Sequence, residues 1–127
     1  MRGFAVAPTI AATLVLGGCA AMTPSGMRSE DKPFATLSLE GEPMELAECA
    51  RVPLINDPPN ALNPPTPIIV TDDKTVSIIG NARDATVYVA DLSPGGTDTR
   101  AVVYASKQYA YRQSNGEAVV DALESCG

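Results

Sequence analysis

The sequence predicts a small α+β domain in which an antiparallel β-meander carries two short helices on one face. Three observations predict this fold class. Five stretches of the chain have the residue patterns of β-strands, two others repeat apolar residues at helical spacing, and each helical stretch contains one cysteine. The predicted element order is β-α-β-β-β-β-α, and a chain of 127 residues has room for one such domain.

The first strand and the first helix of this domain are predicted between residues 35 and 51. Ala35–Glu40 alternates apolar and polar side chains, which is the period of a strand with one buried face. From Pro43 to Arg51 the apolar residues recur at i, i+3 and i+4, and proline is favoured in a first helical turn. We therefore expect a short helix that turns Cys49 inward and stops before Pro53.

A proline-rich segment follows the predicted helix. Pro53 to Pro67 contains six prolines together with asparagine and aspartate, so we expect an extended surface loop. A preformed extended backbone loses little entropy when it docks on a partner, and this loop is one candidate binding surface. The alternative is a rigid connector between helix and sheet.

Four apolar runs separated by turn residues predict the antiparallel meander. Asp72-Asp73 and Gly80-Asn81 are the first two expected turns, and Ser93-Pro94-Gly95-Gly96 is the third. The runs themselves are Ile68–Thr71, Thr75–Ile79, Ala85–Leu92 and Arg100–Ala105.

The last helix is predicted near the C-terminal end of the sequence. Ser114 and Glu117 have the Ser-x-x-Glu spacing of a capping box, and the apolar residues that follow, Cys126 included, keep helical spacing. The preceding segment, Ser106 to Gln113, fits either a strand or a helix, and its tyrosines favour a strand.

The first residues have the order of an export signal. Arg2 supplies a positive charge, and the apolar run from Phe4 to Leu16 is too short to cross a bilayer. The run ends in Leu16-Gly17-Gly18-Cys19, which resembles the lipobox of bacterial lipoproteins. The alternative is an ordinary secretory signal that happens to contain a cysteine.

The lipoprotein resemblance implies three segments. Residues 1–18 would be the signal peptide, residues 19–33 a lipidated Cys19 with a flexible tether, and residues 34–127 a periplasmic domain. Acylated Cys19 would hold the protein to membrane lipid, because more than one acyl chain anchors stably. Ala20, in place of an aspartate after the cysteine, implies sorting to the outer membrane of a two-membrane cell, or anchoring in the cell membrane of a one-membrane cell.

Lipidation of Cys19 leaves one pair of cysteines, Cys49 and Cys126. An even pair in an oxidising compartment predicts a disulfide, which would hold both helices on the same side of the sheet. The alternative is metal binding by the two thiolates, but zinc sites usually take four ligands from cysteine, histidine and carboxylate residues, and the chain has no histidine. We expect no metal and no cofactor.

Composition narrows the function further. Fifteen acidic against nine basic residues give a net charge of −6, which opposes a nucleic-acid partner. Without histidine the chain has no Ser-His-Asp triad and no imidazole base. Ser29 and Lys32 have the Ser-x-x-Lys spacing of acyl-serine enzymes, but the companion motifs of those enzymes are missing. We expect a protein that is not an enzyme.

A second candidate binding surface lies near the end of the predicted sheet, where tyrosines alternate with cations as they do at protein and glycan contacts. Its residues are Tyr104, Lys107, Tyr109, Tyr111 and Arg112. The alternative is that the tyrosines pack against the sheet and the charges are solvated.

Together these patterns predict a non-catalytic, outer-membrane-anchored lipoprotein. Its α+β domain would face the periplasm and contact another envelope component, either a protein or a glycan. The alternative is a periplasmic module that binds a soluble ligand or inhibits an enzyme.

Overall fold

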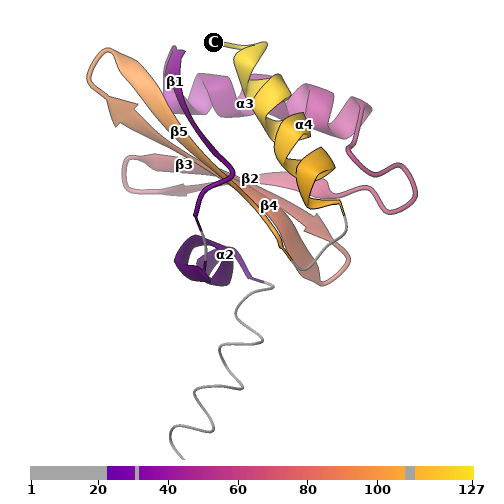
Figure 1. Ribbon diagram of the computed structural model, residues 1–127. Coiled ribbons are helices and arrows are strands. Elements are labelled where there is room, and N and C mark those ends of the chain that lie inside the picture. The colour runs from indigo at the N-terminus through magenta and orange to yellow at the C-terminus, as the bar shows by residue number, and fades with distance from the viewer. Residues whose placement is uncertain (1–22, 31, 108–110) are drawn as a thin grey trace, which may run out of the picture.

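The computed structural model describes residues 23–30, 32–107 and 111–127 and confirms the predicted α+β class. Five strands form one sheet, α3 and α4 cover one face, and α2 lies against the other (Figure 1). The elements are α2 (Pro24–Glu30), β1 (Ala35–Glu40), α3 (Pro43–Asn56), β2 (Thr66–Asp72), β3 (Thr75–Ala82), β4 (Ala85–Gly95), β5 (Asp98–Ala105) and α4 (Arg112–Glu124).

The sheet has the order β1-β5-β4-β3-β2, and all neighbouring strands are antiparallel. Strands β2 to β5 form the predicted meander, and β1 joins its far edge by pairing with β5. Strand β4 therefore occupies the centre. Because side chains alternate across a strand, each strand contributes residues to both faces of the sheet.

The main core lies between the sheet and helices α3 and α4. Ile78, Ala90 and Val103 are aligned across three neighbouring strands and are completely buried. Leu54 of α3 and Leu123 of α4 pack into the same cluster. Burying a side chain of this size contributes roughly 1.5–3 kcal/mol, so this layer holds most of the stabilising burial.

A disulfide between Cys49 and Cys126 confirms the predicted pairing, with the two Cα atoms 6.1 Å apart. It joins α3 to the residues just after α4. The expectation that Cys49 faces inward is wrong, because Cys49 is exposed, whereas Cys126 is half-buried and packs against the main core. The buried positions of α3 belong instead to Leu46, Ala47, Ala50 and Leu54, which leaves Cys49 on the flank of the helix.

Helix α2 corrects the prediction of a flexible tether over residues 24–30. Thr23 caps this helix, since its Oγ1 accepts a hydrogen bond of 3.1 Å from the N–H of Gly26. The Met27 side chain is only 5% exposed and packs against Ile79 and Val89. Contact with the sheet thus orders a segment whose composition offers little apolar surface. Cys19 lies outside the described residues.

Helix α3 continues through Pro53 to Asn56, so the predicted stop before Pro53 is wrong. Proline removes one helical N–H donor, but Leu54 is buried in the core and favours continuation of the helix. The proline-rich loop is correspondingly shorter and spans residues 57–65. Pro67 lies in β2, an edge strand, where a missing N–H is tolerated.

Two predicted turns also lie elsewhere. Gly80 is inside β3 beside a bulge, and the turn to β4 is built on Arg83, whose φ is +58°. Position 80 requires glycine for packing and not for a turn, because an added Cβ would lie 2.2 Å from Cζ of Tyr88. The next turn begins later than expected, since β4 continues to Gly95 and Gly96 has φ +91°.

Helix α4 begins at Arg112, earlier than predicted. Ser114 and Glu117 are therefore both inside the helix, and the predicted capping box is not formed. Among the described residues of the 106–113 segment none is in a strand: Ser106 and Lys107 follow β5, and Arg112 and Gln113 are helical. Arg112, the first residue of α4, packs against Phe34, because its guanidinium lies 5.3 Å from the centre of the Phe34 ring.

The contact between Gly80 and Tyr88 predicts that Gly80→Ala destabilises the domain. A methyl group has no space beneath the buried ring, so we expect the free energy of unfolding to fall by about 1–3 kcal/mol. Urea unfolding monitored by circular dichroism measures this change. Gly95→Ala is the matched control, because its nearest contact is 3.4 Å, and equal losses for the two variants would contradict this account.

The disulfide predicts a second stability change. Its sequence separation of 77 residues closes a long loop, so replacing both Cys49 and Cys126 by serine should lower the free energy of unfolding by about 3–4 kcal/mol. Urea unfolding with and without reductant gives the measurement. Reductant should destabilise the unsubstituted protein and leave the double variant unchanged. A double variant as stable as the oxidised protein would contradict the prediction.

Candidate functional site

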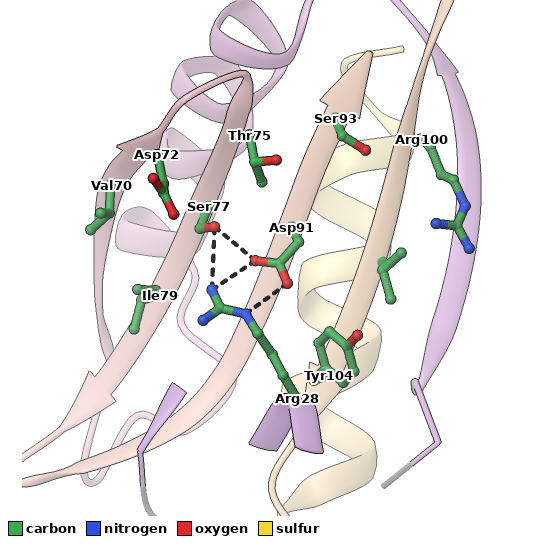
Figure 2. Close-up of a pocket in the computed structure, with 11 residues that line it drawn as sticks. Arg28, Val70, Asp72, Thr75, Ser77, Ile79, Asp91, Ser93, Arg100 and Tyr104 are labelled. Carbon is green, nitrogen blue, oxygen red and sulfur yellow. Dashed lines mark hydrogen bonds and ion pairs between the residues drawn. The ribbon is translucent and has the colours of Figure 1, made fainter. Parts of the chain in front are cut away.

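A groove of about 530 Å³ lies on the sheet face opposite α3 and α4, and α2 contributes to its lining (Figure 2). We call this the open face. Strands β2 to β5 supply all the remaining residues of the lining. The lining residues are Arg28, Val70, Asp72, Thr75, Ser77, Ile79, Asp91, Ser93, Arg100, Val102 and Tyr104.

Strand register arranges these residues in rows across the sheet. Ser77, Asp91 and Val102 are cross-strand neighbours, so their side chains lie on one face. The row on one side is apolar and contains Ile79 and Val89. The open face is thus divided into an apolar row beneath α2 and a polar region beyond it.

An ion pair connects α2 to the polar region (Figure 2). Arg28 donates from Nε to Oδ2 of Asp91 and from Nη2 to Oδ1, both at 2.8 Å. Ser77 Oγ donates to the same Oδ1 at 2.7 Å and accepts a hydrogen bond of 3.3 Å from Arg28 Nη2. This is a bidentate, charge-assisted contact, the strongest geometry available to the pair.

The hydrogen bond that Arg28 donates to Asp91 raises the pKa of Arg28 above its usual value, and this outweighs the opposing effect of partial burial. Both oxygens of Asp91 already accept hydrogen bonds, so this carboxylate is held as an anchor. The ion pair between Arg28 and Asp91 therefore positions helix α2 on the sheet.

Met27 provides the apolar half of the same contact. It packs with Ile79 and Val89, and Tyr104 borders this cluster. Met27 and Arg28 are adjacent in α2, so this short helix places one apolar side chain and one cation on the sheet together.

The predicted tyrosine and arginine surface is not brought together in one place. Tyr104 lies on the open face beside the α2 contact, whereas Arg112 stacks over Phe34, which packs against the core on the other side of the sheet. Lys107 and Tyr111 are exposed between β5 and α4. Tyr109 lies outside the described residues.

The residues that build the α2 contact were not predicted from sequence. Arg28 and Asp91 are 63 residues apart, and Arg28 lies in a segment without periodic apolar residues. One signal was available: Asp91 is a charged residue inside a run that otherwise has the composition of a buried strand. Such a charge requires a partner or solvent.

The proline-rich loop borders a second groove, of about 480 Å³, between the end of α3 and helix α4. Pro58 and Pro59 form one wall, and Glu117 and Asp121 of α4 line the other. This loop was a predicted binding surface, and its groove is acidic, without a basic residue in its lining.

Tyr88 places a buried polar group in the main core. The hydroxyl of Tyr88 has no hydrogen-bond partner in the described part of the chain, and burial raises its pKa well above the usual value. It therefore stays protonated at neutral pH. Its ring packs over Gly80 in the core, remote from the open face.

In residues 23–30, 32–107 and 111–127, no group of three or more histidine, cysteine, aspartate or glutamate side chains is arranged to hold a metal ion. None of the described helices is both long enough and apolar enough to cross a membrane. Comparison of the chain with protein-family models, curated proteins and solved structures finds no match.

The Arg28–Asp91 contact predicts how firmly α2 is held. Asp91→Asn removes the charge, and we expect α2 to be destabilised by about 1 kcal/mol, since both side chains are partly exposed. Trypsin should then cleave the Arg28–Ser29 bond roughly fivefold faster, as measured by mass spectrometry. Lys32 precedes a proline, which protects that bond from trypsin.

Asp72→Asn is the matched control for this prediction. Asp72 lines the same groove but makes no hydrogen bond to Arg28 in the described structure, so its loss should leave cleavage at Arg28 nearly unchanged. Equal rates for the Asp91 variant and the unsubstituted protein would show that the ion pair does not hold α2.

Proposed function

We propose that this protein is a non-catalytic lipoprotein of the outer membrane whose domain faces the periplasm and contacts another envelope component. The observation that carries the proposal is the lipobox-like Leu16-Gly17-Gly18-Cys19 after a short apolar run. Acylated Cys19 would be the attachment to membrane lipid.

The disulfide supports export. Once Cys19 is acylated, Cys49 and Cys126 are the two cysteines of the sequence left to pair, and these two are bonded to each other. Stable disulfides form in oxidising compartments such as the periplasm and are rare in the cytosol. Cys49 is exposed, so in a reducing compartment this bond would be accessible to thiol reductants.

Helix α2 supports a domain held near the lipid. Only three residues separate Cys19 from Thr23, the first described residue, and a fully extended chain of this length reaches about 14 Å. Because Pro24–Glu30 packs on the open face, the domain would be tethered by this short connection. The open face would then lie on the anchored side of the domain.

The open face also supports contact with a partner. Its groove combines hydroxyl groups, carboxylates and guanidinium groups with an apolar row, which is the mixed chemistry of specific recognition surfaces. The ion pair there restrains α2 and leaves the rest of the polar region accessible. We propose that the partner binds on this face.

A second candidate function is binding of a soluble ligand or inhibition of an enzyme. The volume of the open-face groove favours it, since small-molecule sites commonly occupy about 300–1,000 Å³. The two candidates differ in the lipid requirement, because a soluble-ligand module would work without the membrane, whereas an envelope accessory would need it.

Intact-mass analysis of protein extracted from membranes tests the proposed function. We expect a chain that begins at Cys19 and carries acyl groups, with Cys49 and Cys126 alkylated only after reduction. Cys19→Ser should release the protein from the membrane fraction without changing its unfolding midpoint. An unlipidated chain with free thiols would contradict the proposal.

A further inference from the structure

The seven residues of α2 are helical because they are docked. A free helix of seven residues is unstable in water, since nucleation costs more than one or two turns return. Met27 and Arg28 supply the side-chain contacts of this helix with the sheet. The surface beneath α2 therefore selects and orders a short helix.

The side chains beneath α2 determine which kind of helix can bind there. An apolar row containing Ile79 and Val89 receives one flexible apolar side chain, and Tyr104 borders it. Directly beside this row, Asp91 accepts the guanidinium in bidentate geometry, and Ser77 accepts one further hydrogen bond from it. These residues lie on β3, β4 and β5, in the interior of the sheet, so the surface persists when α2 leaves.

We propose that the surface beneath α2 is a docking site for a basic amphipathic helix of a partner protein, and that α2 occupies this site until the partner displaces it. The net charge of −6 favours a basic partner. This inference deepens the proposed contact with an envelope component and rests on it for the identity of the partner as an envelope protein.

Two observations make displacement feasible. The ion pair is partly exposed, with 35% of the Arg28 side chain and 20% of Asp91 accessible, so a competing cation can reach the carboxylate. In addition, the covalent connection of α2 provides an effective concentration on the order of millimolar. A partner helix displaces α2 when its concentration relative to its own Kd exceeds this effective concentration relative to the Kd of α2.

Displacement would also lengthen the connection to the membrane. With α2 docked, the chain from Cys19 to Thr23 reaches about 14 Å, but with α2 released the connection extends to Phe34 and reaches about 50 Å. Binding of the partner helix would thus allow the domain to move away from the lipid surface.

A peptide of residues 20–33, labelled with a fluorophore, tests the docking site by fluorescence anisotropy with the detergent-purified protein. The double substitution Met27→Ser with Arg28→Ala disrupts α2 and leaves the sheet surface unchanged. We expect this variant to bind the peptide at least tenfold more tightly than the unsubstituted protein. Adding Asp91→Asn should reduce binding about fivefold, whereas adding Asp72→Asn should not.

A competition experiment tests the same site without any substitution. Excess unlabelled peptide added to the unsubstituted protein should accelerate hydrogen exchange at the Met27 amide of the protein, whereas a peptide carrying the Met27→Ser and Arg28→Ala changes should not. The inference is overturned if the peptide binds all variants equally or if it leaves this exchange rate unchanged. Neither result depends on lipidation, so the mass analysis of Cys19 and this test fail independently.

Discussion

The two-sidedness of strand β4 is the constraint on which the rest of this structure depends. As the central strand of the sheet, β4 must satisfy both faces at once, and its alternation sends Ala90 and Leu92 toward the helices and Val89 and Asp91 toward the open face. The first pair builds the core with α3 and α4. The second pair leaves an apolar side chain and a carboxylate side by side on the other face.

That second pair accounts for helix α2. A carboxylate in the middle of a sheet loses hydration when anything covers it, so a covering segment must also bring a cation. Arg28 supplies the cation, and Met27 covers the neighbouring apolar row. A segment with little apolar surface thereby becomes part of the domain, and only three residues of the sequence separate Cys19 from Thr23, which caps the docked helix.

Local patterns were sufficient to predict most of the fold. The alternation in Ala35–Glu40 and the helical spacing after Pro43 lie in short windows, and both elements were found. Features that depend on distant residues are not predicted. Position 80 must be glycine because the Tyr88 ring packs against it, and α3 continues past Pro53 because Leu54 is buried in the core. Arg28 pairs with Asp91, which is 63 residues away in the sequence. The predicted tyrosine surface failed for the same reason, because sequence neighbours were separated onto different sides of the sheet.

The central claim is that Arg28 and Asp91 hold α2 on the open face, and a double-mutant cycle tests it most directly. Hydrogen exchange at the Met27 amide would be measured for the unsubstituted protein, Arg28→Ala, Asp91→Ala and the double variant. This account predicts a coupling of about 1 kcal/mol, with the double variant no worse than either single one. Strictly additive effects on exchange would contradict it.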